Sequence, residues 1–175
     1  MQSKAVFEAL AKYKEGVDGS VLAIVEKLGE EKILAPSGAY LPTVLAQLKH
    51  IFGSDVNWIK RLKAAFPNSA ALAKTRFAQY DLESLKALPI ADRAGFFADM
   101  RELDRDIAAF VAELDEKALD ETITYKGYTG KEETHELWKA LLHWFNHGVH
   151  HRGSISGQLD ALGVENDYSS LLPKI

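Results

Sequence analysis

The chain has 175 residues, which suits one domain with one hydrophobic core, so we expect a single domain over residues 1–175. Hydrophobic residues make up 47% and charged residues 26%, and the apolar runs are too short to cross a membrane. The formal net charge of −4 gives no general attraction to phosphate backbones, which argues against nucleic-acid binding. The chain has no cysteine, so disulfides and a cysteine thiolate nucleophile are excluded and any metal ligands are nitrogen or oxygen.

The first residues lead into a helical pattern rather than an apolar signal core, so we expect a cytoplasmic protein. Apolar residues with a period near 3.6 predict a first helix over residues 3–28. Residues 29–40 are a loop by composition. A leucine-rich stripe then predicts a second helix over residues 41–65, with Pro42 in its first turn and Pro67 just beyond its end.

His50 lies on this second helix, opposite the centre of the leucine stripe. Isolated surface histidines are common, so the residues alone favour a solvent-exposed side chain. The alternative is a second face that lines a polar cleft. Small and polar residues share the row of His50, and they are Thr43, Ala46, Gly53 and Asn57.

The second half of the chain predicts two more long helices. Residues 68–87 are an alanine-rich connection that becomes helical toward its end, and apolar spacing predicts a third helix over residues 90–116. Alternating β-branched and polar residues predict a short β element over residues 122–128. The capping-box spacing of Thr129 and Glu132 places the last helix over residues 131–162. The expected fold is therefore all-α, an antiparallel four-helix bundle with a short β element before the last helix.

The last predicted helix carries four of the six histidines, His143, His147, His150 and His151. His147 and His151 are four residues apart, so on a helix they share one face and can both point at one ion. On an ideal helical wheel they lie roughly 80° and 40° from Leu137 in the apolar stripe, and the other two are turned further outward. Spacing alone does not fix which pair of these histidines would bind the ion. Two partly buried histidines that hydrogen-bond to their neighbours are the alternative to a metal site.

Two competing kinds of site fit less well. Glu132 to His135 forms a Glu-x-x-His, as in di-iron bundles, but those need a second copy, and Gln47 stands where the glutamate before His50 would be. Residues 153–157 have the spacing of a serine nucleophile elbow, yet they fall inside a predicted helix rather than on a strand-to-helix turn. Any catalysis is therefore expected to need a metal rather than a side-chain nucleophile.

Two segments of the chain resemble the DinB family. Residues 48–62 fit the pattern of the family's second helix, which is Leu-x-His followed by Asp, Trp and Arg; the matching residues are Leu48, His50, Asp55, Trp58 and Arg61. Residues 146–153 read Asn-His-Gly-Val-His-His-Arg-Gly and resemble the family's Asn-His-x-x-His-His-Arg-Gly-Gln run. Leu103-Asp104 and residues 163–169 are also similar to family features. The resemblance thus extends from the second helix to the C-terminus.

This resemblance implies a four-helix bundle in which one histidine of the second helix and two of the last helix hold a divalent ion, usually zinc or nickel. Carried over by position, the metal ligands are His50, His147 and His151. The family pattern therefore makes His50 a ligand rather than an isolated surface residue. The remaining histidines are expected not to bind the ion, and they are His135, His143 and His150.

Two positions depart from the family pattern. Ser154 stands where the family usually has Gln, and the first helix has Lys14 and Val17 near the positions where Asn and Trp are often found. Neither change removes a ligand. Both departures bear on which further molecule binds beside the metal.

Three nitrogen ligands on two rigid helices leave at least one coordination position open, which is typical of a catalytic metal site. Family members identified by the resemblance include transferases that use a low-molecular-weight thiol such as bacillithiol or mycothiol, a mycothiol-dependent isomerase and proteins described as metal-dependent hydrolases. We expect an enzyme that transfers a low-molecular-weight thiol to a small electrophile, with the metal ionising the thiol.

Two alternatives to thiol transfer stay open. A metal-dependent hydrolase would need a general base, for which Asp55 is the only candidate and is more readily assigned a structural pairing. A non-catalytic metal-binding protein of a stress response is the alternative from another class. The expected partners are a small-molecule thiol and an electrophile, without nucleic acid or membrane, and a homodimer is one option for the oligomeric state.

Overall fold

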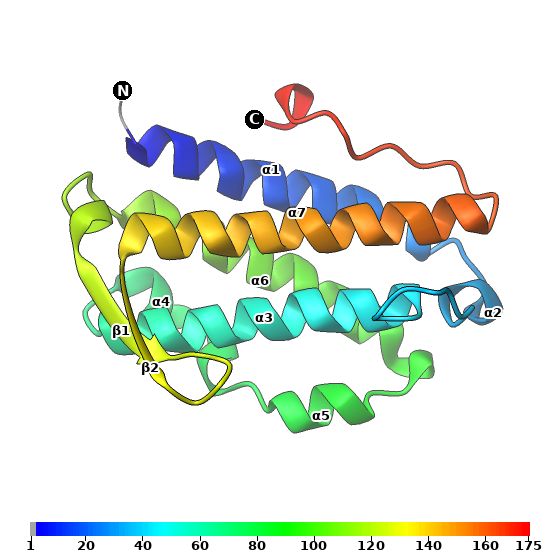
Figure 1. The fold of residues 1–175 in the computed structure, drawn as a ribbon, viewed down its shortest axis with the longest axis horizontal. Coiled ribbons are helices and arrows are strands. Elements are labelled where there is room, and N and C mark those ends of the chain that lie inside the picture. Colours follow the sequence, from blue (N-terminus) through cyan, green and yellow to red (C-terminus); the bar gives the residue numbers. More distant parts are fainter. Residues whose placement is uncertain (1–2) are drawn as a thin grey trace.

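The structure is a computed structural model, and it describes residues 3–175 (Figure 1). Four long helices form its body, and they are α1 (Ser3–Val25), α3 (Val44–Ala65), α6 (Arg93–Glu113) and α7 (Leu137–Ala161). Helices α1 and α7 run in one direction and α3 and α6 in the other, and α1 packs on α6 while α3 packs on α7. The predicted all-α bundle with antiparallel packing is confirmed.

Each long helix turns an apolar face inward, and the aromatic side chains of the core come from several elements. The largest fully buried side chains are Trp144, Phe52, Phe77, Phe97 and Phe110. Burial of this apolar surface is the main force that holds the helices together. Since α3 and α7 pack directly on each other, residues on their facing sides are brought together across more than ninety positions of sequence.

The ends of the long helices agree with the prediction to within three residues, and the largest difference is at the start of α7. The first and third long helices lie a few residues inside their predicted ranges. Helix α3 begins at Val44 because the Thr43 side chain caps it, accepting a 3.0 Å hydrogen bond from the backbone N–H of Ala46. Pro42 therefore precedes the cap and does not lie in the first turn.

Shorter helices connect the long ones. The predicted loop after α1 contains a single turn, α2 (Glu30–Ile33). The alanine-rich connection holds α4 (Ala70–Lys74), a 3₁₀ turn η1 (Arg76–Gln79) and α5 (Leu82–Ala87), which carry the chain back to the start of α6. The other 3₁₀ turns are η2 (Ile90–Asp92), η3 (Ala118–Asp120) and η4 (Leu172–Lys174).

The predicted β element is one half of a hairpin. Strand β1 (Thr122–Lys126) pairs antiparallel with β2 (Glu132–Glu136), with Thr122 opposite Glu136. The prediction that the last helix begins near residue 131 is wrong, because residues 132–136 belong to β2. Gly130 adopts φ of 80° in the turn and lets the chain reverse there, so the predicted capping box does not form.

Within residues 3–175, no helix combines the length and apolar character that crossing a membrane requires.

Candidate metal centre

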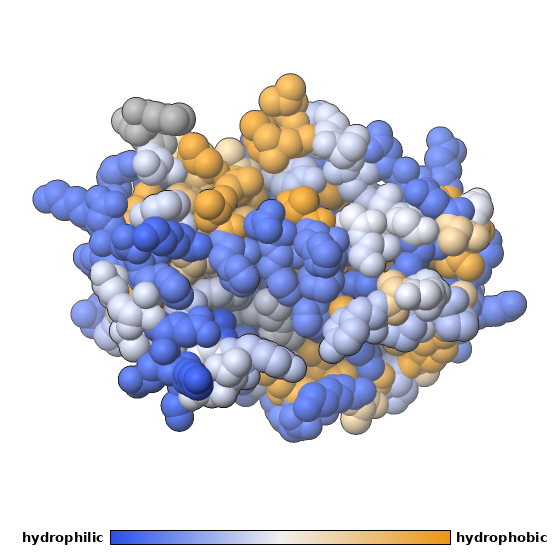
Figure 2. Space-filling view, in the orientation of Figure 1, coloured by the Kyte–Doolittle hydropathy of each residue, from blue (hydrophilic) through white to orange (hydrophobic). Residues whose placement is uncertain are grey.

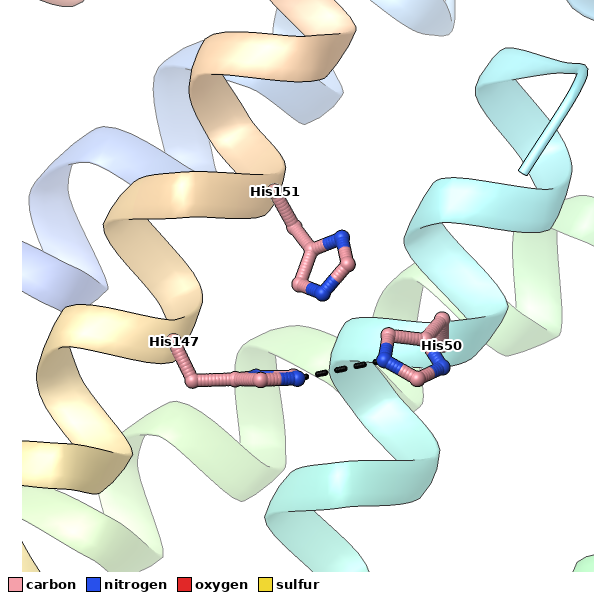
Figure 3. Close-up of side chains that lie close together, drawn as sticks. All are labelled: His50, His147 and His151. Carbon is pink, nitrogen blue, oxygen red and sulfur yellow. Dashed lines mark hydrogen bonds between the residues drawn. The ribbon is translucent and has the colours of Figure 1, made fainter. Parts of the chain in front are cut away.

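His50 of α3 and His147 and His151 of α7 meet where the two helices pack together (Figure 3). One ring nitrogen of each lies within 4.8 Å of the other two, and the Nε2 atoms of His50 and His147 are 3.1 Å apart. Two ligands of a tetrahedral ion with bonds near 2.1 Å are about 3.4 Å apart, so these nitrogens are close to the required spacing. The three residues, here called the histidine triad, could hold one metal ion.

The local structure explains why these three meet. His147 and His151 are one turn apart on α7, as their spacing predicted, and both are partly buried. His50 is exposed, which agrees with the interpretation from the residues alone, but its ring points toward His147 and His151 of α7. The triad is therefore open on one side, which leaves room for a further ligand.

Burial lowers the pKa of all three imidazoles. The pKa of His147 falls to about 4, chiefly through burial and further through the neighbouring histidines, whose positive charges would repel its own. The pKa of His151 also falls to about 4 for the same reasons. Burial lowers the pKa of His50, and the charge of Asp55 partly offsets this. All three rings are neutral at pH 7, so each has a lone pair that can bind a metal.

Gln47 fixes the orientation of His151. The side-chain amide nitrogen of Gln47 donates to the Leu41 carbonyl at 3.2 Å and to Ser154 Oγ at 2.7 Å. A carbonyl only accepts, so the amide oxygen of Gln47 is the atom that faces His151 Nδ1 at 2.8 Å. His151 therefore donates from Nδ1, and its Nε2 carries the lone pair. A hydrogen-bonded residue of this kind holds a ligand histidine in the required tautomer.

Gln47 was missed as a site residue in the sequence. In the sequence, Gln47 stands out only as a mismatch to the di-iron pattern, although it lies three residues before His50 on the same helix. Ser154, noted as a departure from the family pattern, helps to orient the Gln47 amide.

The remaining histidines lie outside this group. The ring of His143 is 6.4 Å from that of His147, and the exposed ring of His150 is edge-on to that of His151, but neither has a ring nitrogen among the atoms that converge at the triad. His135 is on β2, with its Nε2 3.9 Å from Glu133 Oε2. Within residues 3–175, no other group of histidines and acids has ligand atoms this close together.

A second polar cluster is buried in the core, and none of its members was predicted to form it. It consists of Lys14, Asp18, Asp55, Asp104 and Arg152, here called the Lys14 cluster, which comes from all four long helices. The Lys14 ammonium is 2.7 Å from Asp18 and 2.9 Å from Asp55, and it also pairs with Asp104. The Arg152 guanidinium is 3.0 Å from Asp18.

Trp144 and Gly148 complete this cluster from α7. The indole N–H of Trp144 donates to Asp55 at 2.5 Å, so both oxygens of Asp55 are engaged. The interpretation that Asp55 pairs structurally, rather than acting as a base, is thereby supported. A side chain at position 148 would place its Cβ 2.9 Å from Arg152 Nη1, so glycine there makes room for the guanidinium.

The Lys14 cluster balances its own charge. Burial alone would lower the pKa of Lys14, but Asp104, Asp18 and Asp55 outweigh it and hold that pKa well above its ordinary value. Burial raises the pKa of Asp104, although Lys14 opposes the shift. Two cations and three carboxyl groups carry no net charge when one carboxyl is protonated, and the raised pKa of Asp104 favours that state.

The fold and this site define a helical-bundle protein with a three-histidine cluster that could hold a metal ion. The family model described as the DinB family matches residues 1–170, so the chain belongs to the DinB family. No curated protein matches the chain.

Proposed function

We propose that the histidine triad binds one divalent ion, zinc or nickel, and that the protein transfers a low-molecular-weight thiol to a small electrophile. The single observation that carries this proposal is the neutral ligand set, in which three imidazoles converge without a carboxylate. A divalent ion held there would keep its full charge, which favours an anionic further ligand and lowers the pKa of a thiol that binds it.

The surrounding residues also favour a thiol that comes from outside the chain. The protein has no cysteine, so it supplies no sulfur nucleophile of its own. Asp55, the only base considered for hydrolysis, is buried and held by Lys14 and Trp144. Low-molecular-weight thiols stay reduced in the cytoplasm, so we propose that the protein acts there.

The test uses the protein loaded with cobalt(II), because a thiolate bound to cobalt gives a charge-transfer absorption band. The expected result is a band that grows on addition of a thiol and that is lost in His147→Ala but kept in His143→Ala. Consumption of thiol with a panel of electrophiles then tests turnover. Metal binding without any thiolate band would contradict thiol transfer and favour hydrolysis or a non-catalytic metal site.

A further inference from the structure

A second cavity lies along α3 from the histidine triad, between α3 and the β-hairpin. It has a volume of about 470 Å³, and we call it the hairpin pocket. The residues of its lining that carry the argument are Asn57, Lys60, Arg61, Tyr125, Lys126 and Tyr128. A cavity of this volume can hold part of a small molecule.

The hairpin pocket lies on the same side of α3 as His50. Asn57 and Arg61 follow His50 by seven and eleven residues, which on a helix returns them to within roughly 20° of its direction. Figure 2 shows hydrophilic side chains gathered over α7 and over the hairpin on the face that carries both sites. One extended molecule on this face could therefore reach both.

A series of neighbouring aromatic rings connects the two sites. The ring of His147 is 6.4 Å from that of His143, which is 6.1 Å from that of Trp58. The Trp58 ring is in turn 5.2 Å from that of Tyr125. Trp58 is buried and both sites share α3, so the helix sets the distance between the triad and the pocket.

Basic side chains line the hairpin pocket. The Arg61 guanidinium lies over the rings of Trp58 and Tyr125, at 4.8 and 4.7 Å, and it donates to the Lys126 carbonyl at 3.0 Å. Within the described part of the chain, neither Arg61 nor Lys126 forms an ion pair. Lys60 also lines the pocket, but its ammonium is directed to the Tyr80 carbonyl at 2.7 Å.

Two acids of β2 lie opposite the pocket residues of β1, and Glu132 faces Lys126 in the strand register without forming an ion pair in the described part of the chain. Glu133 lies opposite Tyr125 across the strands, and its charge contributes to raising the pKa of Tyr125. Its carboxylate lies against Gly127, where a Cβ would be 1.9 Å from Oε1. Arg61 lies over two rings and donates one N–H to the Lys126 carbonyl, so other donors of its planar guanidinium are available for a carboxylate or a phosphate.

We infer that the thiol cosubstrate carries an anionic group that Arg61 and Lys126 bind in the hairpin pocket while its sulfur reaches the histidine triad. This rests on the proposed function. The Arg61 guanidinium lies at the level of Trp58, eight residues from His50, which corresponds to about 12 Å along the helix. The cosubstrate is therefore larger than cysteine, with its charge at the end remote from the sulfur.

Thiol binding to the cobalt(II) protein tests this with matched pairs of probes. Glutathione is compared with its glycine ethyl ester, and phosphopantetheine with pantetheine, so that a carboxylate or a phosphate is removed at nearly constant size. We expect at least one anionic probe to bind about tenfold more tightly than its neutral partner, because a hydrogen bond to a charged group contributes about that much to affinity. The pair that shows the difference distinguishes a carboxylate from a phosphate.

The variants assign this difference to the pocket. Arg61→Gln is expected to abolish the preference for the anionic probe and Lys126→Gln, on the exposed hairpin, to reduce it. The matched control Lys63→Gln, which removes a charge elsewhere on α3, should leave it intact. The anionic thiol 3-mercaptopropionate is too short to span the two sites, so its affinity should not depend on Arg61. A preference that is absent in the wild type, or that survives in Arg61→Gln, would overturn the inference.

A second measurement separates this inference from the proposed function. Glutathione methylated on sulfur, and pantetheine phosphate methylated in the same way, are titrated into the metal-free protein while the Nε–H signal of Arg61 is followed by NMR. A shift with an anionic probe but not with its neutral partner supports the pocket even if no thiol binds the metal. No shift with either anionic probe contradicts the pocket, whatever the cobalt spectrum shows.

Discussion

The histidine triad and the Lys14 cluster both join α3 to α7, yet their electrostatics are opposite. The triad consists of three neutral bases without an acid among them, and it is open to solvent on one side. In the Lys14 cluster the charges are buried and meet opposite charges. The difference indicates that the fold depends on keeping the buried charges paired, whereas the triad holds lone pairs ready for a cation.

The largest expected effect is on the buried cluster. Replacing Lys14 by methionine leaves three carboxyl groups without their shared cation, so we expect the free energy of unfolding to fall by about 3–5 kcal/mol. Urea unfolding of the metal-free protein measures this. Lys12→Met on the exposed side of α1 is the matched control and should change little. A cluster that contributes nothing to the fold would leave both variants equal in stability.

The next largest effect is on metal binding, and it distinguishes the triad from the neighbouring histidines. His147→Ala should weaken metal binding by more than about a hundredfold, the upper end for loss of an outer-shell partner, because a direct ligand is removed. His143→Ala, one turn earlier, should keep the metal. Calorimetric titration with zinc and with nickel gives both affinities. Zinc should raise the melting temperature of the wild type and of His143→Ala only, since an ion stabilises the state that binds it. Equal loss of affinity in both variants would place the site on another face of α7.

A smaller effect is expected at Gln47, which touches the triad from the core. Gln47→Leu removes the acceptor for His151 Nδ1 and should weaken metal binding by about 10–100-fold. Gln47→Glu keeps an acceptor and should retain far more of the affinity. The same titration compares the two. If leucine and glutamate have the same effect, Gln47 acts through packing and not by orienting the imidazole.

A further effect is the response of the metal-free protein to pH. The pKa values of His147 and His151 are about 4 in the folded state, below the ordinary histidine value near 6.5. Between these values the unfolded chain binds more protons than the folded one, so stability should fall as pH is lowered from 6.5 toward 4. Replacing both histidines by alanine should flatten the unfolding curve in this window. An unchanged pH dependence in that double variant would assign the effect to other groups.

Sequence patterns predicted the long helices and the shared face of His147 and His151 because both depend on local repeats, whereas His50 was assigned only through the resemblance to the DinB family. Apolar spacing marks the buried faces, and the four-residue interval of His147 and His151 places them on one face of α7. The start of α7 was not predictable in this way, since a capping-box spacing also occurs in the hairpin turn, where Gly130 reverses the chain.

The Lys14 cluster shows a different limit. Lys14 and Asp18 lie four residues apart within the apolar stripe of α1, which is a local signal for a buried ion pair. Their other partners, Asp55 and Asp104, lie on other helices, so only the packing of the bundle reveals that these residues meet. The same is true of Gln47, whose role depends on a contact with α7.

The most direct measurement of the central claim is an anomalous difference map from crystals grown with zinc, with diffraction data collected on both sides of the zinc absorption edge. We predict one strong peak, about 2.1 Å from a ring nitrogen of each of His50, His147 and His151. A peak bonded instead to His135, His143 or His150, or no peak at the triad from protein that binds zinc in solution, would contradict the account.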